Sequence, residues 1–85
     1  MNYFVTFFTE NLRGITTETS LECFNKQFER KVDAIAYFEE WFDYLNKAPK
    51  KEIFSLATTD DVSHIIIDVR NEDDTFCKQS IVVLQ

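Results

Sequence analysis

Residues 33–47 read DAIAYFEEWFDYLNK, and they form the only segment of the chain in which apolar residues recur at helical spacing. Burying one large apolar side chain stabilises a fold by ~1.5–3 kcal/mol, so several of them outweigh the modest helix propensity of so many aromatic residues. We therefore predict a helix over residues 33–47 that forms because it docks on the rest of the chain. Its apolar stripe consists of Ile35, Phe38, Phe42 and Leu45, widened by Ala34, Tyr37, Trp41 and Tyr44.

Both ends of this helix carry typical signals. Asp33 can act as the N-cap or lie in the first turn, where a carboxylate meets unpaired backbone N–H groups. Lys47 suits the carbonyl end, and Pro49 forbids continuation. The face opposite the apolar stripe predicts an acidic ridge, made of Glu39, Glu40 and Asp43.

The remaining chain has the alternation and turn residues of strands. We expect strands at residues 2–9, 15–24, 52–58, 62–70 and 75–84, and turns at 10–14, 59–61 and 71–74. The first strand is apolar on both faces and is predicted to be central. Short turns favour a hairpin of the first two strands and an antiparallel meander of the last three. The predicted fold is a single α+β domain over residues 1–85, with two layers, a five-stranded antiparallel sheet and one helix, in the order ββαβββ.

Residues 25–32 allow two interpretations. The apolar spacing would let the helix extend back to Asn25. Alternatively, residues 27–29 complete a bent second strand and the helix begins near Lys31. We prefer the second interpretation because Asp33 is a plausible local cap.

Charge excludes one class of function. The formal net charge of −6 makes sequence-independent binding of DNA or RNA unfavourable, because phosphate contacts need clustered lysine and arginine. If nucleic acid takes part, it does so indirectly, and its contacts would be Lys26, Arg30 and Lys31. The acidic turns, Asp60, Asp61, Glu72, Asp73 and Asp74, are either turn-forming and solubilising charge or a surface for a basic partner.

Two cysteines and the N-terminal segment bear on location. Cys23 and Cys77 lie in predicted strands without CxxC spacing, so we interpret them as buried free thiols in a reducing compartment, with a disulfide between them as the alternative. The first eight residues, MNYFVTFF, are too few to span a membrane and lack a basic n-region. We expect a cytoplasmic protein, in the host cytoplasm if a phage encodes it, with no membrane partner.

Candidate catalytic and metal-binding residues do not combine into a motif. His64 and Asp68 share a strand face but are four residues apart, roughly 13 Å along a strand, which is too far for a hydrogen bond. Cys23 and His64 carry no nucleophile signature. The acidic ridge has no histidine beside it to complete a metal site. We therefore expect no enzyme activity, no catalytic or metal site and no cofactor.

One helix can cover only one face of the predicted sheet. Large apolar groups also lie on the other face, namely Phe4, Phe8, Ile66, Val82 and Leu84 or the alternate residues beside them. Contiguous exposed apolar patches of more than a few hundred Å² typically mark an interface. We expect a second copy, as a homodimer, or a different protein to cover this face or an edge strand next to it. The alternative is that long side chains such as Lys78 and Arg70 cover it.

In overall form the chain resembles a class of small acidic inhibitors that phages and mobile elements carry against host defence, including anti-CRISPR proteins and phage antitoxins. The resemblance rests on the chain's size, its pI of about 4.6, its aromatic-rich composition and its lack of catalytic groups. It implies inhibition by occupying the surface of a nuclease, a toxin RNase or a CRISPR complex, where acidic side chains stand in for phosphates.

The leading hypothesis is therefore a protein-binding inhibitor or antidote that acts stoichiometrically on a target with a basic surface. Its predicted contacts are the acidic ridge (Glu39, Glu40, Asp43), the acidic turns (Asp60, Asp61, Glu72, Asp73, Asp74) and the aromatics Tyr37, Trp41 and Tyr44. The alternatives are a structural or assembly subunit without an inhibitory role, or a bacterial immunity protein.

Overall fold

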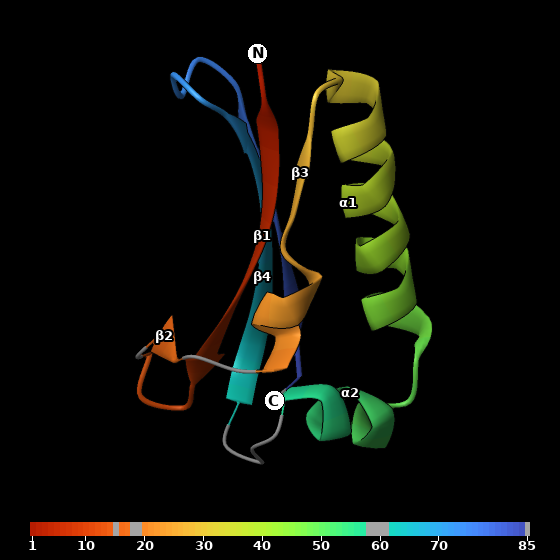
Figure 1. Cartoon of the computed structure of the whole chain (residues 1–85). Coiled ribbons are helices and arrows are strands. Elements are labelled where there is room, and N and C mark those ends of the chain that lie inside the picture. Colours follow the sequence, from red (N-terminus) through yellow and green to blue (C-terminus); the bar gives the residue numbers. More distant parts are fainter. Residues whose placement is uncertain (15, 18–19, 58–61, 85) are drawn as a thin grey trace.

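The computed structural model describes residues 1–14, 16–17, 20–57 and 62–84. Along the chain lie β1 (Tyr3–Asn11), β2 (Thr16–Thr17), the short 3-10 helix η1 (Ser20–Phe24), β3 (Lys26–Phe28), α1 (Lys31–Lys47), α2 (Lys50–Ala57), β4 (Val62–Asn71) and β5 (Cys77–Val83). Figure 1 shows the sheet with α1 lying along one of its faces and α2 closing one end. The predicted α+β class, with an antiparallel sheet, is confirmed.

β1 lies inside the sheet, as its two apolar faces predicted. The strand order is β2-β1-β4-β5, and β3 also pairs with β1. β4 pairs with β1 along its whole length, so β2 and β3 share the opposite edge of β1. β3 pairs with residues 3–5 and β2 with residues 9–10, which leaves a gap between them at Phe7.

The gap in this edge is closed by a side chain. Asn25 lies between η1 and β3, and its Oδ1 accepts a hydrogen bond of 2.9 Å from the backbone N–H of Phe7. A buried N–H without an acceptor is costly, so this contact lets the second edge of β1 change from β2 to β3 without an orphan donor.

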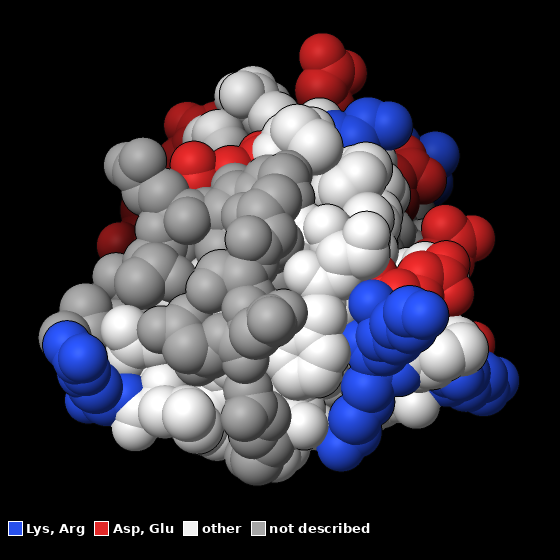
Figure 2. Space-filling view, turned by 90° about the horizontal axis from the view of Figure 1, so that it is seen from below, with Lys and Arg blue, Asp and Glu red and all other residues white. Residues whose placement is uncertain are grey.

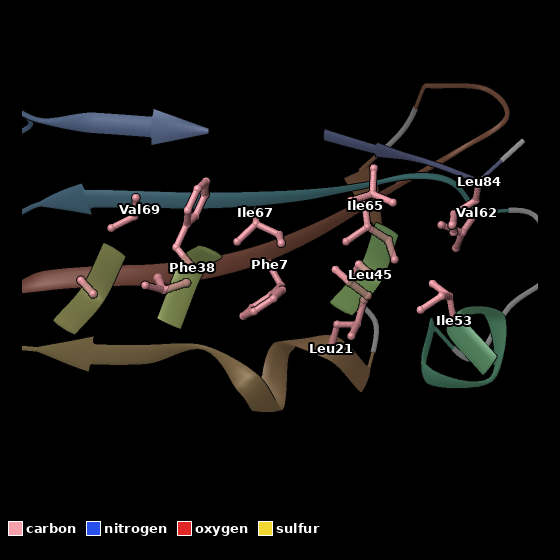
Figure 3. Close-up of a cluster of buried hydrophobic side chains, with 13 residues drawn as sticks. Phe7, Leu21, Phe38, Leu45, Ile53, Val62, Ile65, Ile67, Val69 and Leu84 are labelled. Carbon is pink, nitrogen blue, oxygen red and sulfur yellow. The ribbon is translucent and has the colours of Figure 1, made fainter. Parts of the chain in front are cut away.

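The core lies between the sheet and the helices (Figure 3). Alternate residues of β1, β4 and β5 point toward α1, which buries Ala34, Phe38 and Leu45 against them. The helix of residues 33–47 is thus confirmed and begins two residues earlier, at Lys31, which places Asp33 in its first turn. The buried apolar residues of the sheet are Val5, Phe7, Val62, Ile65, Ile67, Val69 and Val82, and Leu21 of η1, Ile53 of α2 and Leu84 complete the cluster.

The predicted strand at residues 52–58 is wrong, because residues 50–57 form α2. The carbonyl oxygen of Pro49 accepts hydrogen bonds from the N–H groups of Glu52 and Ile53, so the proline that ends α1 also starts the next helix. The apolar residues of a short segment fit both the strand period and the helix period. Ile53 is buried on the inner side of α2, and this packing favours the helix. The predicted set of five strands, the single helix, the order ββαβββ and the three-stranded meander are therefore wrong as well. The predicted turn at 59–61 lies outside the described residues.

The long second strand predicted at 15–24 is also wrong. Among the described residues of this segment, Thr16 and Thr17 alone are strand residues, and they form the predicted hairpin with β1. Residues 20–24 instead form η1, in which Leu21 and Phe24 are three residues apart and both pack inward. Residues 15, 18 and 19 lie outside the described residues. The preferred interpretation of residues 25–32 is confirmed in part: a strand at 26–28 precedes the helix, but η1 separates this strand from β2, so it does not complete the second strand.

The other predicted strands are present with shifted ends: β1 runs two residues into the predicted turn at 10–14, and β5 covers residues 77–83 of the predicted 75–84. Gly14 has the positive φ of 77° expected of the only glycine, and Asp74 has a φ of 56° in the turn between β4 and β5. Asn71 fixes that turn, because its Oδ1 accepts a hydrogen bond from the N–H of Phe76 and its carbonyl accepts one from the N–H of Asp74. Neither α1 nor α2 has the length and apolar character that crossing a membrane requires.

Candidate interaction surface

The face of the sheet that points away from α1 is the candidate site, and we call it the open face. Strand pairing places its residues in rows across β1, β4 and β5. The rows are Phe4–Arg70–Cys77, Thr6–Asp68–Gln79, Phe8–Ile66–Ile81 and Glu10–His64–Val83. The row Thr6–Asp68–Gln79 is polar, whereas the row Phe8–Ile66–Ile81 is apolar. We call Thr6, Asp68, Arg70 and Gln79 the polar half of the open face, and Phe8, Ile66, Ile81 and Val83 the apolar half.

The apolar half is exposed to solvent. Phe8, Ile81 and Val83 keep 39, 53 and 59% of their surface accessible. The predicted members Phe4, Phe8 and Ile66 are on this face. Val82 and Leu84 are not: they are 3 and 4% exposed and point into the core, and the alternate residues Ile81 and Val83 take their place.

The polar half is organised by an ion pair. Asp68 has no exposed surface, and Arg70 lies across it with its Nε 2.9 Å from Oδ1 and its NH2 2.8 Å from Oδ2. This pairing with Asp68 raises the pKa of Arg70 above its ordinary value, so the guanidinium stays charged. Cys77 donates a weak hydrogen bond from Sγ to Asp68 Oδ2 at 3.8 Å. Arg70 thus covers part of the face, whereas Lys78 lies on the helix side over the ring of Phe38.

His64 and Ser63 form a short contact that is structural. The Nδ1 atom of His64 is 2.8 Å from Ser63 Oγ, which also lies 3.2 and 2.9 Å from the carbonyl oxygens of Glu10 and Asn11. The hydroxyl has one proton, and when it bonds a carbonyl the His64 Nδ1–H is the donor to Oγ. Ser63 is 4% exposed and its proton is engaged, so the pair lacks a free nucleophile.

Both cysteines are free and exposed, so the prediction of buried thiols is wrong. Cys23 belongs to η1 instead of a strand, and Cys77 lies on the open face. The two are on opposite sides of the sheet, because η1 packs on the helix side. Within the described ranges, no three histidine, cysteine, aspartate or glutamate side chains group closely enough to hold a metal ion.

The acidic ridge is exposed along α1, on the opposite side of the molecule from the open face. Two of its carboxylates have a cation nearby: Lys47 lies 2.9 Å from Asp43 and Lys78 lies 3.5 Å from Glu39. These pairs reduce the negative field of the ridge. Figure 2 likewise shows lysine and arginine beside aspartate and glutamate at the end of the molecule that carries α2.

The described acidic turn, residues 72–74, borders the open face. Asp74 lies 3.6 Å from Arg70, which connects this turn to the polar half. Glu72, Asp73 and Asp74 are exposed, and Asp60 and Asp61 lie outside the described residues. The structure therefore places the acidic turn beside the open face and separates both from the acidic ridge.

The three predicted anchoring aromatics hold α1 in place. Trp41 packs against Phe7 and Phe24, with ring centroids 5.2 and 4.6 Å apart. Tyr37 donates a 2.6 Å hydrogen bond to the carbonyl of Phe24. Tyr44 is the most exposed of the three and donates a 2.7 Å bond to Glu52 of α2, which raises the pKa of the phenol.

The predicted basic group extends from β3, which contains Lys26, to the start of α1. Lys26 sits over the rings of Phe28 and Tyr37 at 5.3 and 5.4 Å, and Lys31 over Phe76 at 4.2 Å. Arg30 is the N-cap residue of α1. The two lysine ammonium groups therefore have aromatic partners within the chain.

Comparison with known proteins found no match: no family model, no curated protein and no solved structure is similar to the chain. The site is therefore defined by its own geometry. The sequence predicted the uncovered face but not the Asp68–Arg70 pair, and it left open whether Val82 and Leu84 or the alternate residues beside them lie on that face. The turn at residues 71–74 could have identified the residues of β5 on the open face, because the turn fixes which residues of β5 lie opposite those of β4.

Proposed function

We propose that the protein is a stoichiometric inhibitor or antidote that binds another protein through its open face. The observation that carries the proposal is the apolar half of that face, where the exposed residues Phe8, Ile81 and Val83 lie around Ile66 of β4. Clusters of exposed apolar residues next to polar groups are typical of docking surfaces.

The open face supports binding better than the acidic ridge does. Two ridge carboxylates already have cations within 4 Å, and the aromatics beside the ridge are engaged in packing. The open face instead offers apolar groups that no described residue covers. Its polar half presents an ion pair that is already satisfied, so a partner does not need to separate it.

Charge favours a partner that handles nucleic acid. The net charge is −6, and the acidic turn of residues 72–74 borders the open face. A nuclease or a CRISPR complex has a basic surface for phosphates, and an acidic protein can occupy it. We place the inhibitor in the cytoplasm, where such targets act.

The test is affinity capture from a nuclease-treated lysate of the source cells, followed by an activity assay of the captured protein. We expect wild-type protein to retain a nucleic-acid-handling factor, and Phe8→Lys to lose it because the variant places a charge within the apolar half. Adding purified wild-type protein should inhibit that factor at equimolar amounts. Association should slow with salt.

Val32→Lys is the matched control, because Val32 is an exposed apolar residue on α1 and the charge change is the same. Equal capture by Phe8→Lys and wild type would refute binding through the open face. A captured factor whose activity is unchanged in the presence of excess protein would refute inhibition.

A further inference from the structure

β5 is an edge strand, and its ladder with β4 fixes which of its backbone groups point outward. The N–H of Asn71 bonds the carbonyl of Phe76 at 3.2 Å, and the N–H of Leu84 bonds the carbonyl of Ser63 at 2.8 Å. In an antiparallel ladder, hydrogen-bonded pairs alternate with non-bonded pairs. The residues of β5 at even positions therefore bond β4. The residues whose N–H and C=O groups point away from the sheet are Cys77, Gln79, Ile81 and Val83.

The same residues carry the β5 part of the open face. In the described chain no strand pairs with their outer side. Five of the seven β5 residues are exposed, whereas β4 beside it has one exposed residue in ten. A strand added at this edge would pair the free backbone groups and extend the open face at the same time.

We propose that a second copy of this chain occupies the edge, with β5 antiparallel to β5 and the two-fold axis at Ser80. Ser80 is the middle residue of the strand, so this register places Cys77 opposite Val83 of the second copy and Gln79 opposite Ile81. All outward-pointing positions of both strands are then paired.

Charge is compatible with this self-pairing. Lys78 is the only charged residue of β5, and the register places it opposite Val82 of the second copy. The two lysines are four residues out of register, roughly 13 Å along the strand, so like charges do not meet. Glu39 of the ridge lies 3.5 Å from Lys78 of β5 and partly neutralises its charge. The acidic turn at 72–74 lies before the paired segment 77–83.

The size of the contact sets its strength. Seven paired residues give a strip about 23 Å long in a sheet layer about 10 Å deep. A strip of this size belongs to the small, weakly associating interfaces, so the dimer should be reversible. Edge pairing leaves both open faces uncovered and joins them into one surface. The dimer proposal does not depend on the proposed function. The inference that a target binds to the joined surface does rest on the proposed function.

Sedimentation velocity over a range from about 1 to 500 µM tests the dimer. Wild-type protein should change from monomer to dimer over this range. Gln79→Pro removes an outward N–H and no bond to β4, so it should remain monomeric, while Gln79→Ala should dimerise like wild type. Wild-type protein that stays monomeric throughout, or Gln79→Pro that dimerises equally, would overturn the proposal.

A disulfide tests the register and does not depend on the proline variant folding. Paired Cα atoms in a hydrogen-bonded site are about 5.5 Å apart, within the range of a disulfide. In a Cys23→Ser background, Val83→Cys should therefore form a covalent dimer through Cys77 and the new cysteine at position 83. Cys23→Ser alone should not, because the two Cys77 residues are roughly 20 Å apart in this register. Absence of the mixed linkage, or linkage between the two Cys77 residues, would overturn it.

The two proposals fail in different ways. Phe8 lies in β1, away from the edge, so Phe8→Lys should still dimerise even where it no longer captures a target. Loss of target binding by Phe8→Lys with an intact dimer would support the proposed function and would leave the dimer proposal unaffected. A monomeric protein that still binds its target through Phe8 would overturn only the dimer.

Discussion

Arg70 covers the carboxylate of Asp68 and bonds both of its oxygens, at 2.9 and 2.8 Å. The Asp68 side chain has no exposed surface, while the Arg70 side chain keeps 46% of its own. A buried carboxylate without a partner is strongly unfavourable, so the arginine is what allows an aspartate in the middle of β4.

Replacing Arg70 by alanine should therefore lower the melting temperature by about 5 °C or more, because Asp68 loses both hydrogen bonds. Arg70→Lys should restore only part of the loss, since an ammonium group cannot make the paired contact. Thermal unfolding followed by circular dichroism measures this. Arg13→Ala is the control, and equal melting temperatures for all three variants would show that the pair is not stabilising.

Asn25→Ala should destabilise the fold by about 1 kcal/mol or more, because the buried N–H of Phe7 loses its acceptor. Asn25→Asp keeps an acceptor oxygen and should be close to wild type. Urea denaturation gives the free energies of unfolding, and hydrogen exchange should show faster exchange at the Phe7 amide in the alanine variant only. Unchanged exchange there would mean that β1 does not depend on this contact.

Tyr44 gives a prediction in alkaline solution. The hydrogen bond to Glu52 raises the pKa of the phenol above 10.0, so this contact stabilises the fold below that pH and is lost as the pH rises through the higher folded value. A difference titration at 295 nm between wild type and Tyr44→Phe should show a midpoint above 10.0. Glu52→Gln should shift the midpoint back, and a wild-type midpoint at or below 10.0 would contradict the contact.

Ile53→Ala tests the docking of α2. Ile53 has no exposed surface, and truncating a buried isoleucine costs about 2–5 kcal/mol. Ser55→Ala, at an exposed position of the same helix, should leave the free energy of unfolding nearly unchanged. Similar stabilities for the two variants would show that α2 does not pack as described.

The sequence predicts those elements whose periodicity is long enough to be unambiguous. The helix of α1 and the strands β1, β4 and β5 follow from apolar spacing over seven or more residues. η1 and α2 are short, and tertiary packing decides that both are helical. Leu21 of η1 and Ile53 of α2 are buried at the edge and the end of the sheet. The alternation of apolar residues in so short a segment does not show this burial.

The candidate site could be predicted only in part, for a related reason. The sequence predicts an uncovered face because a helix covers only one face of the sheet, whereas apolar residues lie on both faces of the strands. Which residues lie on it depends on register, and a shift of one residue exchanges Val82 for Ile81. The Asp68–Arg70 pair was hidden because two charges on one strand face look like solvent-exposed residues in the sequence.

Binding through the open face is tested by the affinity of the captured partner for Phe8→Lys and for Val32→Lys, measured by titration calorimetry at one ionic strength. An anchoring aromatic residue of an interface contributes about 2 kcal/mol or more, so we predict that Phe8→Lys weakens binding about 30-fold and that Val32→Lys stays within about twofold of wild type. Wild-type affinity for Phe8→Lys, with weakened binding for Val32→Lys, would place the contact on α1 and contradict the account.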